Sequence, residues 1–179
     1  MPDALELLAE QHREVTSLFT QMGETAAPKK RRTILDRIVK ALTQHAAIEE
    51  EVFYPTVAKR VVDGDGFITV SREEHEKAKT QLHKLDGLEP DDPLFAPSVG
   101  ELIHEVKVHV GDEETQLFPR VRSAFSAAEL SELGARMAKR TAKTPARPHP
   151  KAPSKPPRNV AANRAAARLD RARPRRTSV

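Results

Sequence analysis

"HAAIEEEVFYP", residues 45–55, places a histidine and a glutamate four positions apart and follows them with apolar bulk. Residues i and i+4 of a helix differ by only about 40° in direction, so His45 and Glu49 face the same side. The stretch "HVGDEETQLFP", residues 109–119, pairs His109 with Glu113 in the same way. An apolar helical stripe therefore carries an imidazole and a carboxylate in two places.

Four segments of residues 1–138 show apolar residues at spacings of three and four, which predicts amphipathic helices. Their stripes span residues 5–22, 34–53, 75–85 and 99–117. Breaks containing Pro or Gly lie at 26–30, 63–67 and 87–98. Short connections between long helices favour an up-down-up-down four-helix bundle, so the predicted fold class is all-α.

Two capping-box sequences predict further helix starts. Ser71 and Glu74 mark the beginning of the third helix, and Ser126 and Glu129 open a short fifth helix over roughly 127–139.

Six polar residues occupy stripe positions that should be buried: His12, His45, Glu49, His75, His109 and Glu113. A lone histidine on an apolar face is more often a hydrogen-bonded core residue than a metal ligand. Six such groups favour a metal, because burying each unpaired would cost several kcal/mol and one shared cation site satisfies them all.

The six residues also form a repeat. His12 precedes His45 by 33 residues and His75 precedes His109 by 34. Such a half-repeat predicts a pseudo-symmetric site for two metal ions, with two histidines apiece and two carboxylates able to bridge. Helix bundles hold di-iron centres through inward Glu and His side chains in this way.

The order H, HxxxE, H, HxxxE over about residues 3–122 resembles the hemerythrin-like HHE cation-binding domains. The resemblance implies a four-helix bundle and a non-haem di-iron centre with an oxo or hydroxo bridge, held by the six residues above. Imidazole and carboxylate ligands alone would also accept manganese or zinc.

The sequence departs from oxygen-carrying hemerythrins at two places. Lys79 stands where their third helix has a second histidine, and the fourth helix has HxxxE in place of HxxxxD. Fewer histidines should leave open metal positions, which favours chemistry at the metal over simple carriage. Lys79 either places a positive charge beside bound peroxide or nitric oxide, or extends out of the bundle.

Small bacterial hemerythrin-like proteins are the most similar branch, and the resemblance implies decomposition of hydrogen peroxide, a catalase-like activity. The alternatives are reversible O₂ or NO binding as a sensor or carrier, and iron buffering. The absence of cysteine excludes disulfides and thiolate sites and argues against the branch that repairs iron centres.

Other residues near the repeat are not expected to bind metal. Glu50 and Glu114 lie five positions after a ligand histidine and should point about 140° away, toward solvent or the outside of the site. Tyr54 lies nearly opposite His45 on an ideal helix, so contact with the site requires a distortion, which Pro55 can provide.

Phe53 and Leu117 should form an apolar lid over the carboxylates. His83 and His104 are expected on the surface, and His149 lies in the tail.

The net charge of +4 conceals an acidic body and a basic tail. Residues 139–179 hold 13 Lys and Arg against Asp170 alone, which leaves a net charge of −8 for residues 1–138. The Pro-rich tail is predicted to be disordered and to suit a polyanion or a protein partner. The N-terminal stretch does not resemble a signal peptide and no stretch predicts a membrane span, so we expect a cytoplasmic protein. The oligomeric state is not predicted.

Overall fold

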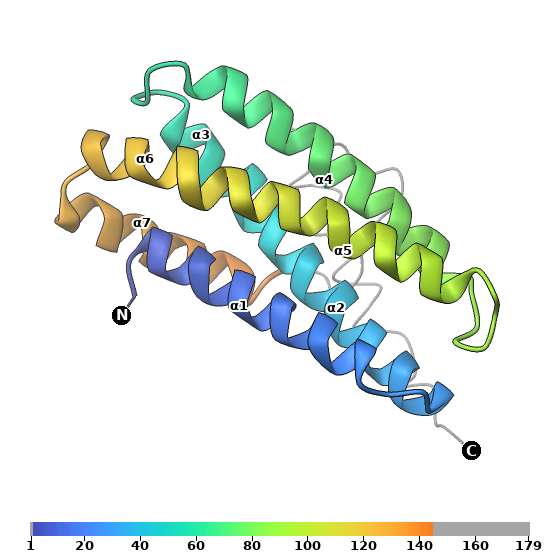
Figure 1. Cartoon of the computed structure of the whole chain (residues 1–179). Helices are drawn as coiled ribbons and strands as arrows, with labels where there is room; N and C mark the ends of the chain where they lie inside the picture. The colour runs from blue at the N-terminus through green and yellow to red at the C-terminus, as the bar shows by residue number, and fades with distance from the viewer. Residues whose placement is uncertain (1, 145–179) are drawn as a thin grey trace.

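The computed structural model describes residues 2–144, and within that range it contains helices and no strand. Four long helices alternate in direction (Figure 1): α1 (Ala4–Gly23), α2 (Pro28–Ile48), α4 (Gly64–Asp86) and α5 (Phe95–Asp112). The predicted all-α bundle is confirmed. The predicted tail starts too early, because residues 139–141 belong to the last described helix. Residues 145–179 lie outside the described residues, so their disorder and their partners remain predictions.

Two of the long helices continue beyond a wide turn. A π-helical turn follows α2 and another follows α5: η1 (Glu49–Phe53) and η2 (Glu113–Leu117). A short helix follows each turn: α3 (Tyr54–Val57) follows η1, and α6 (Phe118–Ala124) follows η2. The fifth helix, α7 (Ala127–Thr141), packs on α1, α2 and η1. No helix in residues 2–144 has both the length and the apolarity needed to cross a membrane.

One predicted capping box is confirmed and the other is wrong. Ser126 and Glu129 cap α7 reciprocally. Helix α4, by contrast, begins at Gly64 and not at Ser71, which is buried inside it. The helix starts early because Ile68 is buried in the core, and tertiary burial outweighs the low helix propensity of the preceding glycines.

The start of α5 also lies within a predicted break. Phe95 is fully buried and opens the helix, and Pro97 is tolerated because the first turn needs no N–H from it.

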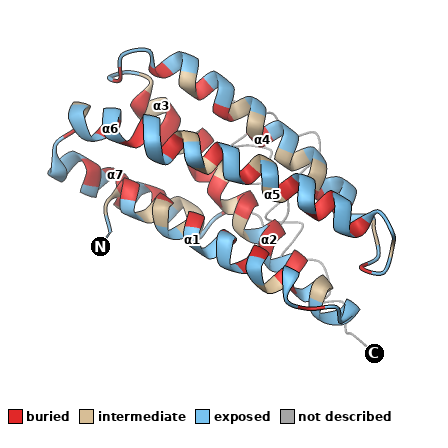
Figure 2. Ribbon diagram, in the orientation of Figure 1, coloured by how far each residue is buried: buried red, intermediate tan, exposed pale blue. Residues whose placement is uncertain are grey.

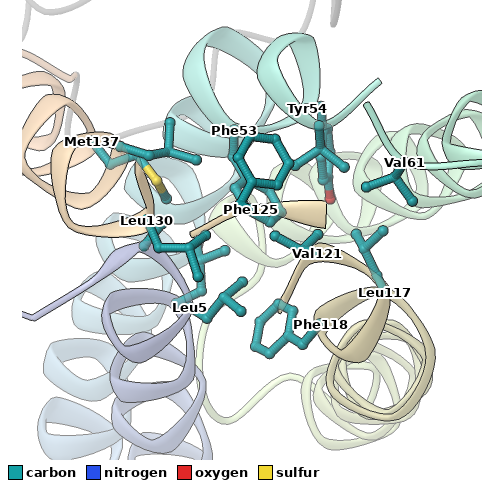
Figure 3. Close-up of a cluster of buried hydrophobic side chains, with 14 of the residues drawn as sticks. Leu5, Phe53, Tyr54, Val61, Leu117, Phe118, Val121, Phe125, Leu130 and Met137 are labelled. Atoms are coloured by element: carbon teal, nitrogen blue, oxygen red, sulfur yellow. The ribbon is translucent and has the colours of Figure 1, made fainter. Parts of the chain in front are cut away.

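Buried faces of the helices meet along the bundle axis (Figure 2) and form two apolar clusters. The α7-side cluster includes Leu5, Phe53, Leu117 and Met137 (Figure 3), and the far cluster includes the residues Val15, Leu42, Leu82 and Val106. Helices α1, α2 and α4 contribute residues to both clusters, and α5 contributes to the far cluster. Each long helix carries one of the four predicted ligand histidines. The polar site therefore lies between two hydrophobic cores.

Helix α7 approaches the start of α1 so closely that only glycine fits at position 134. A Cβ on Gly134 would lie 2.8 Å from the carbonyl carbon of Asp3 and 2.8 Å from the carbonyl oxygen of Pro2. Because both contacts are backbone atoms, Gly134→Ala should force α7 outward and cost about 1–3 kcal/mol of unfolding free energy. Urea unfolding followed by circular dichroism measures this loss.

Gly100→Ala is the matched control. Gly100 lies within α5 with nothing within 4 Å of the added Cβ, so alanine should be neutral or stabilise by up to about 1 kcal/mol. Equal stability of Gly134→Ala and the wild type would show that α7 is not held this closely.

Candidate metal centre

All six predicted ligand residues are buried in the middle of the bundle. One histidine lies on α1 and one on α4, while each HxxxE pair spans the junction between a long helix and its π-helical turn. The six residues are each at most 6% exposed: His12, His45, Glu49, His75, His109 and Glu113. The structure thus brings together every residue that the repeat selected.

The histidine Nε2 atoms converge on two carboxylates. Glu49 Oε2 lies 3.2 Å from His45 Nε2 and 3.1 Å from His75 Nε2. Glu113 Oε2 lies 3.5 Å from His12 Nε2 and 3.8 Å from His109 Nε2. Each carboxylate therefore lies between one histidine of the first half of the chain and one of the second.

These donors form two groups that share Glu49. The first group is His12, His45, Glu49 and Glu113, and the second is Glu49, His75 and His109. Within each group the donor atoms lie within 4.8 Å of one another. The arrangement provides two adjacent cation positions with a common carboxylate.

Unsatisfied donor atoms test whether a metal fits. Among residues 2–144, four buried atoms of this site have no hydrogen-bond partner: His12 Nε2, His45 Nε2, Glu49 Oε1 and Glu113 Oε2. Leaving a buried polar atom unpaired costs about 1–3 kcal/mol. A bound cation removes that cost, and iron, manganese and zinc all accept imidazole nitrogen and carboxylate oxygen. The residues therefore fit a metal centre.

The glutamates that follow the ligand glutamates orient two of the histidines. Nδ1 of His12 donates to Glu114 Oε1 at 2.7 Å, and Nδ1 of His75 donates to Glu50 Oε1 at 3.0 Å. Of the two expected directions, solvent is wrong for Glu50, which is buried, whereas Glu114 is exposed. Both contact the outer nitrogen of a ligand ring, as the second direction allows. With the proton on Nδ1, the Nε2 lone pair faces the centre.

The other two histidines are oriented by residues that the sequence reasoning missed. Nδ1 of His45 donates to Gln11 Oε1 and Nδ1 of His109 donates to Glu74 Oε2, each at 3.0 Å. Gln11 and Glu74 directly precede the single histidines His12 and His75 in the sequence. Their equivalent places in the repeat were a signal that could have identified them.

The π-helical turns explain why Glu50 and Tyr54 face the site. The backbone N–H of Tyr54 donates to the carbonyl of Glu49 and that of Phe118 to the carbonyl of Glu113, each five residues back. One extra residue in a turn rotates the following residues by about 100° relative to an ideal α-helix. The distortion anticipated near Pro55 is present, and with it Tyr54 reaches the site.

Prolines mark both turns in the sequence. Pro55 follows Glu49 by six residues, and Pro119 follows Glu113 by six. A proline ring clashes with the carbonyl four residues earlier in an α-helix, and a wider turn relieves this clash. Arg140 of α7 further holds η1 through two hydrogen bonds to the buried carboxylate of Glu51.

Tyr54 belongs to the α7-side cluster (Figure 3), and its hydroxyl bridges the two carboxylates. Its hydroxyl donates to Glu113 Oε1 at 3.0 Å and lies 3.3 Å from Glu49 Oε2, and its ring stacks on His75. Phe118, at the equivalent place in the repeat, stacks on the ring of His12 but has no hydroxyl. Phe53 and Leu117 are fully buried beside them, as the predicted lid requires.

Tyr54→Phe should destabilise the metal-free protein by about 1.5–3 kcal/mol, because hydrogen bonds to charged groups contribute in that range. Urea unfolding of chelator-treated protein measures the change. A loss below about 0.5 kcal/mol would show that the hydroxyl does not stabilise the carboxylates.

Without metal, protons balance the charges of the site. Burial and the charge of Glu113 raise the pKa of Glu49 well above its ordinary value. Burial opposes ionisation of Glu113, but the charges of the nearby histidines, first that of His109, outweigh it and hold its pKa far below the ordinary value. Burial and the charge of His12 hold the pKa of His45 well below its ordinary value.

A cavity of about 60 Å³ adjoins the histidines on the side of the far cluster. Lys79 lines it, but the Lys79 ammonium donates to the exposed carboxylate of Glu76 at 2.7 Å. The lysine therefore extends toward the surface, in agreement with the second expectation. His83 and His104 are exposed, as predicted, and His149 lies outside the described residues.

Comparison with known proteins agrees with this geometry. The hemerythrin HHE cation-binding domain family matches residues 3–137. The chain belongs to this family. The crystal structure of a hemerythrin HHE cation-binding domain-containing protein from Mycobacterium kansasii superposes with a TM-score of 0.70 at 26% identity, over 79% of this chain and 86% of that chain.

Two curated relatives add to the comparison. An uncharacterized hemerythrin-like protein of Schizosaccharomyces pombe is 28% identical over 77% of this chain and 68% of its own length. A DNA nickase of Nostoc sp. is 33% identical over 68% of this chain. The match covers only 34% of the length of the nickase. As an HHE domain, the chain is a metal-binding helical protein with His and Glu clusters.

Proposed function

We propose that the HHE site holds two iron ions and that the loaded protein decomposes hydrogen peroxide to water and oxygen. Two molecules of peroxide give two of water and one of O₂, so one peroxide is oxidised and the other reduced. The convergence of unpartnered histidine and glutamate atoms beside a small cavity carries the proposal. Bound iron would supply the electron exchange, which no side chain of the site supplies alone.

The protein contributes ligands and their orientation. The four histidines bind through Nε2, because their Nδ1 atoms are occupied by Gln11, Glu50, Glu74 and Glu114. The two carboxylates keep the cation positions adjacent, and Tyr54 restrains both of them from the side away from the cavity.

The cavity favours small reactants. A water-sized molecule needs about 15 Å³ by this measure, so about 60 Å³ admits a few atoms and excludes organic substrates. The apolar α7-side cluster closes the opposite side, so reactants reach the histidines from the far-cluster side.

The apolar part of the cavity wall favours a second candidate, reversible binding of O₂ or NO. The residues Val15, Leu42, Leu82 and Val106 line the cavity and suit uncharged diatomic molecules. Peroxide decomposition remains the first proposal, because the set has fewer histidines than the oxygen carriers and leaves room for a reactant at the metal.

Oxygen release measured with an electrode distinguishes the two. Protein loaded with iron should release one O₂ for every two peroxides consumed, over many turnovers per chain. Zinc-loaded protein is the control, since zinc occupies the same ligands without changing its oxidation state. Stable O₂ or NO binding with no peroxide loss would replace the first proposal by the second.

A further inference from the structure

We infer that the two metal positions are electronically unequal and that Gln11 and Glu74 are positioning residues that set the difference. The inference rests on the proposed two-iron site. Position A is the pair His12 and His45, and position B is the pair His75 and His109.

The direct donors of the two positions are similar, with one difference at Glu113. Each position has two histidine Nε2 atoms. Glu49 Oε2 lies 3.2 Å from His45 Nε2 in position A and 3.1 Å from His75 Nε2 in position B. Glu113 Oε2 lies 3.5 Å from His12 Nε2 in position A and 3.8 Å from His109 Nε2 in position B. Glu113 therefore approaches one histidine of each position, but it joins only the donor group of position A.

The acceptors on the outer ring nitrogens are not equivalent. In position A they are the neutral amide of Gln11 and the carboxylate of Glu114, whose side chain is 43% exposed. In position B both are carboxylates, and the side chains of Glu50 and Glu74 are only 4% and 15% exposed. Position B thus has two shielded negative charges and position A has one, which faces water.

A carboxylate that accepts the Nδ1 proton makes the imidazole a stronger electron donor to a metal at Nε2. Water screens such a charge strongly and a buried environment screens it weakly, so Glu50 and Glu74 act more than Glu114. The outer acceptors therefore favour a ferric ion more at position B than at position A. With two irons bound, we therefore expect the first electron of a reductive titration to enter at position A.

The test is a spectroelectrochemical titration of the iron-loaded full chain, which gives two one-electron potentials. Changing an outer partner of a metal-bound histidine alters metal binding by about 10–100-fold, which corresponds to about 60–120 mV for one electron. Glu74→Gln keeps an acceptor oxygen for His109 but removes its charge, and Gln11→Glu adds a charge behind His45. Each variant should bring the two potentials closer by about that amount.

The double variant, Gln11→Glu with Glu74→Gln, exchanges the two environments and should restore a separation close to that of the wild type. Gln21→Glu makes the same chemical change on α1, about 15 Å along the helix from Gln11, and should leave the separation unchanged.

An unchanged or wider separation in Gln11→Glu and Glu74→Gln, with two irons still bound, would overturn the inference. If Glu74→Gln loses iron, Gln11→Glu decides alone. Wild-type protein that retains fewer than two irons contradicts the proposed function itself, so the two failures are distinct.

Discussion

His109→Ala is expected to lower peroxide decomposition by at least about 100-fold. Changing even an outer partner of a ligand costs about 10–100-fold in metal affinity or activity, so removing a direct donor should reach or exceed the upper end. The loss leaves position B with one histidine, and Glu113 loses one of the two rings that its Oε2 approaches. Iron content and oxygen release measured on the same sample test this expectation.

His104→Ala is the control, because His104 lies on the same helix but faces solvent. It should retain iron and activity within about twofold of the wild type, since exposed substitutions usually change stability by less than about 0.5 kcal/mol. Retention of iron and turnover by His109→Ala would remove that histidine from the ligand set.

Removing the metal is expected to lower the free energy of unfolding by about 4 kcal/mol. A ligand held at about 1,000 times its dissociation constant stabilises the native state by roughly this amount. For a chain of this length, each kcal/mol corresponds to about 2–4 °C, so the melting temperature should fall by about 8–16 °C. Scanning calorimetry with and without a chelator measures the difference.

The physical reason is the cluster of unpaired donor atoms between two apolar cores. Metal-free protein must share protons among them, while a cation satisfies all of them together. Chelator should have almost no effect on His109→Ala if that variant binds no metal. Equal melting temperatures of metal-free and iron-loaded wild type would contradict a buried metal site.

The long-range pattern of the site could be predicted from the sequence, because the repeat of H and HxxxE survives any local change in helix geometry. Ligand pairs four apart lie within or at the edge of regular helix, so their direction follows the ideal period. Glu50 and Tyr54 lie inside or just after a π-helical turn, where the ideal period fails. The ideal period therefore misplaces both residues, and only Pro55 indicated that Tyr54 could reach the site.

Helix boundaries show the same division between local and tertiary effects. Ser126 caps α7 because the chain before it is extended and the serine side chain is free to bond backward. Ser71 has the same local sequence signal, but it is buried and lies within a helix that packing extends to Gly64. A capping box predicts a helix start only where no buried residue continues the helix upstream.

The most direct test of the account is the number of iron ions that one chain retains after reconstitution and removal of loosely bound metal by gel filtration. The account predicts two, one beside each pair of histidines. A chain that retains none would show that the buried histidines and glutamates are structural and that the proposed di-iron site is wrong.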